Sequence, residues 1–238
     1  MSAPQVLIIG GGPAGLMAAE VLAGYGYPVE LLEAMPTAGR KFLQAGVGGL
    51  NITHAEPLAG FISRYGAQAG ILQPMIEAFP PAAIRDWIHG LGIETFTGSS
   101  GRVFPREMKA APLLRAWLRR LRLLGVEIRT RQRWLGWTEQ GALLFRGPEG
   151  CYQRRPAATL LALGGGNWPQ PGSDAASLPW LQGRGVPLAP LPPSHCAFEL
   201  PGCSPPPREP SPGAPPTRVA TRPARGFRTR SSHLTCQG

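Results

Sequence analysis

The chain has 238 residues, of which 43% are hydrophobic, and it carries a formal net charge of +10. At about 100–200 residues per domain, this length allows one domain, or one domain and a fragment. No stretch of about 18 apolar residues runs without charges or glycine clusters, and no basic and apolar leader precedes the first strand pattern, so a membrane-spanning helix and a signal peptide are both disfavoured. We therefore expect a cytoplasmic protein that does not enter a membrane.

The positive charge is concentrated near the C-terminus. Residues 201–238 contain six arginines against one acidic residue, Glu209, together with nine prolines and four glycines. Because no hydrophobic period survives there, the segment cannot bury enough surface to offset its chain entropy. We predict a folded domain over residues 1–198 and a disordered, Pro/Arg-rich basic tail over residues 199–238.

The cysteines do not indicate a metal site. Cys151, Cys196, Cys203 and Cys236 form no Cys-x-x-Cys pair, and with the four histidines they show no metal-ligand spacing. We predict ordinary thiols and no bound metal.

Residues 5–34 have the pattern of a βαβ unit. The apolar run QVLII predicts a buried parallel strand, GGGPAG a turn, LMAAEVLAGYG a helix that ends in glycines, and VELLEA a second strand. Two parallel strands joined by a helix form a right-handed crossover. The fold class predicted from this unit is a Rossmann-like α/β domain built on a parallel sheet.

The later segments add further elements. Residues 36–66 are too rich in glycine for regular structure and predict a long functional loop. A helical pattern over residues 74–91 is broken at Pro80-Pro81, and residues 110–124 predict an amphipathic helix with a leucine stripe. VEIRT, RWLGWT, ALLFRG and CYQRR predict four short strands, the last three as an antiparallel meander, and ATLLALGGG predicts a strand that runs into glycines.

The turn Gly10-x-Gly12-x-x-Gly15 has the spacing of a dinucleotide-binding fingerprint. The first glycine permits the tight turn, the second lets a pyrophosphate approach the backbone, and the third lets helix and strand pack closely. Backbone N–H groups and the helix dipole then face the phosphates. Glu33, at the end of the second strand, can accept hydrogen bonds from both ribose hydroxyls and would repel a 2′-phosphate, which disfavours NADP in this site. The alternative is a glycine-rich turn that holds no ligand.

The segment after Glu33, GRKFLQAGVGGLNIT, decides between FAD and NAD. Arg40 and Lys41 can neutralise phosphate, glycines such as Gly48 allow a flat ring system to lie close, and Asn51 and Thr53 offer hydrogen bonds. A plain NAD dehydrogenase has no reason to place such a loop here, whereas FAD extends past the strand ends into the protein. We therefore predict FAD as the cofactor.

Four segments carry a family resemblance: GGGPAG, GRKFLQAGVGGLNIT, GSSGRVFPREMKAAPLL and LALGGGNWPQPGSD. Over about residues 4–198 the chain resembles the YhiN/BaiN-like, aminoacetone-oxidase-type family of NAD(P)/FAD-dependent oxidoreductases. The resemblance implies that the first segment binds the ADP half of FAD and that the second lies along the pyrophosphate and flavin. It also implies that the glycines at 164–166 close over the cofactor and that the strand near Trp134 offers backbone to the adenine. The predicted cofactor-binding residues are Gly10, Gly12, Pro13, Ala14, Gly15, Glu33, Arg40, Lys41, Gly48, Asn51, Thr53, Trp134, Gly164 and Gly165; the sequence identifies no catalytic residue.

The chain departs from the family pattern in two places. Where the commoner loop reads GGGRCN, residues 46–51 read GVGGLN, so the arginine and the cysteine are absent. Family members are also longer: they insert a second domain near residue 190 and return with a segment that supplies a last strand and a helix N-terminus at the flavin. The Pro-, Arg- and Ser-rich sequence after residue 200 resembles GC-rich DNA read in the wrong frame. We hypothesise a frameshift or truncation near codon 200, which would leave the FAD-binding domain incomplete.

The expected function is that of a flavoprotein oxidoreductase that transfers hydride between FAD and an unidentified small-molecule substrate or NAD(P)H. One alternative is a truncated, non-catalytic remnant of such an enzyme. A second is a flavin-dependent tRNA-modifying protein, but the arginines between Arg115 and Arg133 alternate with leucines as on a solvated helix face, and the basic tail has no aromatic interleaving to support base stacking. Arg102 and Lys109 could hold an anionic substrate, or equally cap a turn and lie in solvent.

Overall fold

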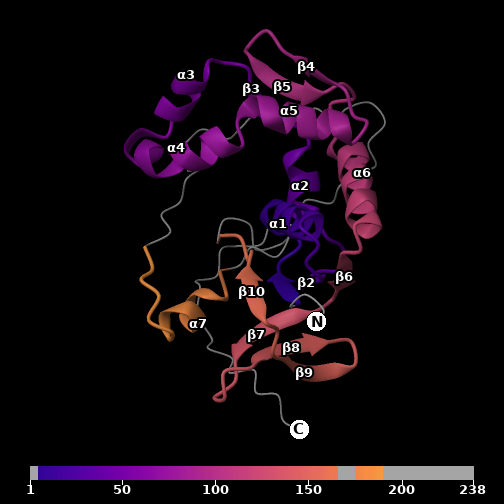
Figure 1. Ribbon diagram of the computed structural model, residues 1–238, viewed down its shortest axis with the longest axis vertical. Coiled ribbons are helices and arrows are strands. Elements are labelled where there is room, and N and C mark those ends of the chain that lie inside the picture. The colour runs from indigo at the N-terminus through magenta and orange to yellow at the C-terminus, as the bar shows by residue number, and fades with distance from the viewer. Residues whose placement is uncertain (1–4, 166–174, 190–238) are drawn as a thin grey trace, which may run out of the picture. The chain divides into compact units, whose positions relative to one another are not determined.

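The computed structural model describes residues 5–165 and 175–189 (Figure 1). Its central element is a four-stranded parallel sheet in the order β10-β1-β2-β6. The strands are β1 (Val6–Ile9), β2 (Val29–Glu33), β6 (Glu127–Thr130) and β10 (Ala158–Leu161). With α1 (Pro13–Gly24) between β1 and β2, the predicted βαβ unit is confirmed.

The strand order reverses at β1. On one side β1 pairs with β2, the next strand in the chain, and on the other it pairs with β10. All of β1 and most of β2 are buried, as expected for parallel strands covered on both faces. In open α/β sheets a ligand binds outside the carboxyl ends of the strands at such a reversal. The topology therefore predicts a ligand site at the carboxyl end of β1.

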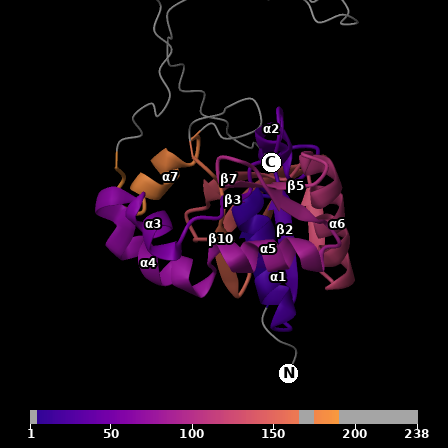
Figure 2. The same ribbon diagram turned by 90° about the horizontal axis from the view of Figure 1, so that it is seen from above.

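Helices cover one face of the sheet. Val6 and Ile8 of β1 pack in a core with Leu16 of α1 and with Leu113 and Trp117 of α6 (Ala110–Leu123). Helix α6 is the predicted amphipathic helix, and it lies beside α1 (Figure 2). The leucine stripe of the sequence thus faces the sheet.

A carboxylate ties three of these helices together. Glu20 of α1 accepts hydrogen bonds from Trp87 Nε1 (3.0 Å) on α5 (Pro81–Gly90), from Trp117 Nε1 (2.6 Å) and from Arg120 (2.9 Å). The two indole rings lie edge to face with centroids 4.8 Å apart. Each of these indole N–H groups therefore has a partner, as polar groups removed from water require.

The predicted antiparallel meander covers the other face. It consists of β7 (Arg133–Trp137), β8 (Leu143–Gly147) and β9 (Gly150–Arg154). Leu7 and Ile9, which alternate with Val6 and Ile8 along β1, pack with Trp134 and Phe145 of the meander. Because side chains of a strand alternate between its two faces, β1 supplies both cores.

The prediction of an irregular loop over residues 36–66 is wrong. That segment contains α2 (Arg40–Ala45), β3 (Thr53–His54) and α3 (Leu58–Ser63). Gly39 and Gly46 stand at the two ends of α2 and not inside it, so the glycines delimit a helix. Strand β3 joins β5 (Arg102–Pro105) and β4 (Thr95–Thr97) in a second antiparallel sheet that the sequence did not predict.

The remaining helices follow proline and glycine signals. The predicted helical region around 74–91 consists of α4 (Ala69–Ala78), after the short η1 (Gly66–Gln68), and α5, which starts at Pro81 as the Pro80-Pro81 break suggested. Helix α7 (Leu178–Gln182) is the last described element.

The structure also bears on three other predictions. Cys151 is disulfide-bonded, so the expectation of an ordinary thiol is wrong there. Among the described residues no helix has the length and apolar character needed to cross a membrane. The predicted domain boundary at residue 198 and the basic tail lie outside the described residues.

Candidate dinucleotide-binding site

A pocket of about 410 Å³ opens at the carboxyl ends of β1, β2 and β10, at the strand-order reversal. Its volume falls within the usual range of about 300–1,000 Å³ for small-molecule sites. Nine of the predicted cofactor-binding residues line it: Gly10, Gly12, Pro13, Ala14, Glu33, Arg40, Lys41, Trp134 and Gly164.

Each glycine of the turn is required for a different structural reason. Gly10 has φ +111°, and a Cβ there would lie 2.3 Å from the carbonyl oxygen of Ala162. A Cβ on Gly15 would lie 1.9 Å from the carbonyl oxygen of Gly10, so this residue allows α1 to pack on β1. A Cβ on Gly12 would meet no described atom within 4 Å, because it would project into open space beside the pocket. Gly12 is therefore where an outside group can approach the backbone.

The first turn of α1 is not capped by any described side chain. Gly12 takes the N-cap position and Pro13, which has no N–H, the first helical position. The remaining N–H groups of that turn carry the positive end of the helix dipole and have no helical partners. An anionic group beside Gly12 would satisfy them.

Glu33 is held in place through both of its carboxylate oxygens. Gly11 N donates to Oε2 and Met35 N donates to Oε1, each at 2.7 Å. Bonds from two backbone N–H groups fix the orientation of the carboxylate, and each oxygen keeps further acceptor capacity. This geometry fits a pair of ribose hydroxyl groups.

Gly11 also links the turn to the next segment. Its carbonyl oxygen accepts a hydrogen bond of 2.8 Å from Gly39 N, the N-cap of α2. Gly39 has φ +73°, and a Cβ there would lie 2.6 Å from the Leu114 side chain of α6. Arg40 and Lys41 in the first turn of α2 are thereby brought to the rim of the pocket.

Five of the predicted residues do not line the pocket. Gly15 lies behind the turn, and Gly165 follows the lining residue Gly164. Gly48, with φ +88°, faces open space in the described structure. Asn51 donates its amide to the carbonyl oxygens of Thr53 (3.0 Å) and Val103 (3.2 Å) and so joins β3 to β5, while the buried Thr53 hydroxyl has no described partner.

Sequence reasoning missed the wall formed by the meander and α7. Gln132, Arg133, Ser177 and Trp180 line the pocket together with Trp134. The rings of Trp134 and Trp180 lie edge to face with centroids 5.1 Å apart, and the buried Nε1 of Trp134 has no hydrogen-bond partner among the described residues. Only tertiary packing brings these residues to the strand ends, because they come more than a hundred residues after the turn.

The described residues fit FAD through its ADP half. The open approach at Gly12, the uncapped helix turn, the oriented Glu33 carboxylate and the cations Arg40 and Lys41 complement a pyrophosphate and its ribose. No group of three or more His, Cys, Asp or Glu residues in the described part of the chain is placed to hold a metal ion.

Comparisons with known proteins found similarities to parts of other chains. A flavocytochrome c3 fumarate reductase in an open conformation superposes with a TM-score of 0.50 at 18% identity, over 70% of this chain and 34% of that one. THI4 of Thermovibrio ammonificans gives a TM-score of 0.47 at 16% identity, over 76% of this chain and 62% of that one. A segment of 38 residues is 60% identical to the NADP(+)-dependent formate dehydrogenase subunit beta of Moorella thermoacetica, which amounts to 16% of this chain and 5% of that protein. The chain thus spans about a third of the fumarate reductase and a small part of the formate dehydrogenase subunit.

The family model of the HI0933-like protein Rossmann domain matches residues 4–236. The match extends past residue 198, where the resemblance was expected to end, into the basic segment. It confirms the predicted flavoprotein family, its Rossmann-like α/β fold and FAD as its cofactor. The chain belongs to the HI0933-like Rossmann-domain family.

Proposed function

We propose that the chain is the FAD-binding part of a flavin-dependent oxidoreductase. The observation that carries the proposal is the pocket at the end of β1, where Gly12 opens to an anion and Glu33 presents a carboxylate fixed by two backbone N–H groups. Family membership supports the same reading. When bound, FAD supplies hydride acceptance and donation, and the protein supplies binding and orientation.

The proposed FAD site has two regions, one for the pyrophosphate and ribose and one for the flavin. Gly10, Gly12 and the start of α1 hold the pyrophosphate, Arg40 and Lys41 neutralise part of its charge, and Glu33 accepts from the ribose. The second region, around Gly48, Asn51 and Thr53, continues from α2 along β3. We assign the flavin end of the cofactor to it, because the chain leads there directly from the pyrophosphate site.

The reaction partner is a small molecule, with NAD(P)H as the proposed electron donor. Anaerobic mixing with NADH or NADPH, followed at the flavin absorption band, tests the donor: bleaching supports it, and an unchanged oxidised spectrum contradicts it.

The first test of the proposal is the absorption spectrum of the purified full chain, with released cofactor identified. Bound FAD supports the proposed function. A colourless protein that does not take up added FAD favours the alternative, a remnant of such a flavoprotein without catalytic activity.

The substitution Glu33→Gln tests the site itself. An amide has only one acceptor oxygen, for which Gly11 N, Met35 N and the ribose hydroxyls would compete, and a ribose hydrogen bond to a charged carboxylate is worth about 1.5–3 kcal/mol. We expect FAD affinity to fall by about tenfold or more in a fluorescence titration. Glu139→Gln, at an exposed position, is the matched control and should leave affinity unchanged. Equal affinities of the two variants would contradict the assigned role of Glu33.

A further inference from the structure

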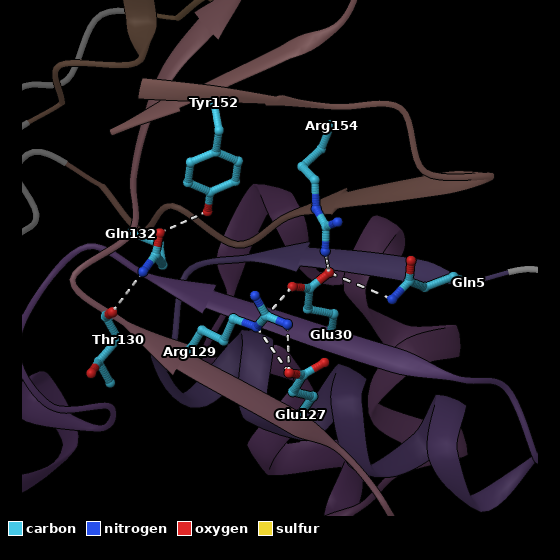
Figure 3. A network of polar contacts seen from close by, with 8 residues as sticks. All are labelled: Gln5, Glu30, Glu127, Arg129, Thr130, Gln132, Tyr152 and Arg154. Carbon is cyan, nitrogen blue, oxygen red and sulfur yellow. Dashed lines mark hydrogen bonds and ion pairs between the residues drawn. The ribbon is translucent and has the colours of Figure 1, made fainter. Parts of the chain in front are cut away.

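A polar network joins strand β9 to the parallel sheet (Figure 3). Glu30 of β2 is 1% exposed, and its carboxylate pairs with Arg154 of β9 and with Arg129 Nε at 3.2 Å. A buried carboxylate is stable only when its charge is compensated in this way. The pairing therefore fixes the position of β9 over β2.

Tyr152 uses that position to reach the pocket wall. It lies two residues before Arg154, so both side chains leave the same face of β9. Its hydroxyl donates to Oε1 of Gln132 at 2.7 Å, and Nε2 of Gln132 donates to the carbonyl oxygen of Thr130 at 3.2 Å (Figure 3). Because a carbonyl oxygen only accepts, the nitrogen must face Thr130, so the orientation of the carboxamide is determined.

A glycine leaves space for this arrangement. A Cβ on Gly147, at the end of β8, would lie 2.5 Å from Oε1 of Gln132.

The Tyr152 hydroxyl is held in its protonated form. Burial raises the pKa of the Tyr152 hydroxyl, and so does the charge of Glu30. The hydroxyl therefore stays protonated and remains a donor at neutral pH.

Gln132 combines this orientation with access to the pocket. It is a lining residue, and its backbone N donates to the carbonyl oxygen of Glu33 at 2.9 Å. A carboxamide has two N–H donors and two oxygen lone pairs. The bonds to Thr130 and Tyr152 use one of each, so one donor and one acceptor of the carboxamide remain.

We propose that Gln132 binds the base edge of the dinucleotide and selects adenine, with Tyr152 as its positioning residue. An adjacent donor and acceptor match the N6 amino group and N7 of adenine, whereas a 6-oxopurine presents two acceptors at the same edge. The inference rests on the proposed function, since it assigns the base to the pocket that receives the ADP half of FAD.

The test compares ADP with IDP as competitors of FAD for the full-length chain. A good bidentate contact discriminates between bases by about tenfold or more, so we expect the wild type to prefer ADP by that factor. Gln132→Leu should lose the preference, and Gly147→Ala should weaken it because the added methyl displaces the carboxamide. Gln153→Leu, on the exposed face of the same strand as Tyr152, is the matched control and should keep it.

Tyr152→Phe separates positioning from packing. It keeps the aromatic ring and removes the hydroxyl, so we expect a reduced ADP preference while the stacked contact with Phe145 persists. A Gln132→Leu protein that still prefers ADP overturns the inference. A wild type that binds FAD without preferring ADP overturns the inference alone, and a wild type that binds neither FAD nor ADP overturns the proposed function with it.

Discussion

Gly12 and Gly15 stand in the same turn but serve different partners. Gly15 makes room for the protein itself, since a Cβ there would lie 1.9 Å from Gly10 O. Gly12 leaves space for a ligand, because a Cβ there would meet no described atom within 4 Å. The fingerprint spacing alone predicts three glycines, whereas the geometry says which one the fold needs and which one the ligand needs.

Alanine at the two positions should separate folding from binding. Gly12→Ala should leave the free energy of unfolding within about 1 kcal/mol of the wild type, while FAD affinity falls by at least about tenfold because the methyl occupies the approach to the backbone. Gly15→Ala should lower the free energy of unfolding by about 1–3 kcal/mol or more through overpacking. Urea unfolding and FAD titration measure the two quantities, and a Gly12→Ala protein with unchanged affinity would refute the assignment.

Single residues were predictable where local chemistry decides their role. Gly10, Gly12 and Glu33 follow from the spacing of the turn and from the end of the second strand. Gln132 and Trp180 did not follow, because nothing in their immediate sequence marks them and only the packing of the meander and α7 brings them to the pocket.

At the scale of elements, Glu20 connects α1 with α5 and α6. Glu20→Ala would leave two indole N–H groups and the Arg120 guanidinium without their carboxylate. Since a buried donor left unpaired costs about 1–3 kcal/mol, we expect the free energy of unfolding to fall by about 2–4 kcal/mol. The exposed Glu77→Ala on α4 is the control and should change it by less than about 0.5 kcal/mol. Chemical denaturation measures both, and equal losses would mean that the network does not stabilise the helix layer.

Strand β9 gives the fold a pH dependence through Tyr152. Its pKa is raised above the ordinary value of 10.0, first by burial and then by the charge of Glu30. The neutral hydroxyl is therefore favoured by folding, and this stability is complete below pH 10 and is lost as pH rises through the higher folded pKa. We expect the stability difference between wild type and Tyr152→Phe to shrink from pH 9 to pH 11 in urea unfolding. A difference that stays constant over that range would contradict the burial of the hydroxyl.

Regular elements with a strong period were predictable, and glycine-rich ones were not. The βαβ unit, α6 and the meander follow from apolar periodicity. The helix α2 was missed because its six residues carry no caps except glycines, and the pairing of β3 with β5 joins residues about fifty positions apart. Such pairing is decided by tertiary contacts, which local propensity does not report.

At the scale of the whole molecule, the family match removes one of the two observations that support the frameshift hypothesis. The hypothesis depends on a change in amino-acid composition and on a family resemblance that ends at the same place, near residue 200. The break in composition remains, but the family match runs on to residue 236. The hypothesis now rests on composition alone.

Resequencing the gene through codon 200, together with peptide mass mapping of the purified protein, decides the matter. A restored reading frame would support a frameshift and extend the chain with new sequence. Peptides that match residues 201–238 as printed, from an unaltered gene, would reject it. The basic segment would then be genuine protein.

The backbone of Gly11 has a consequence for how the cofactor is held. Its N–H is bound by the Glu33 carboxylate and its carbonyl oxygen by the N–H at the start of α2. A ligand that fixes Glu33 therefore also restrains the backbone of Gly11, to which the start of α2 is hydrogen-bonded, and a ligand at the far end of α2 acts on Glu33 through the same residue. Thermodynamic reciprocity requires the two effects to be equal. Occupation of the ribose end and of the ring end should therefore be felt by each other, so that an ADP fragment alone alters the affinity for a separate flavin fragment.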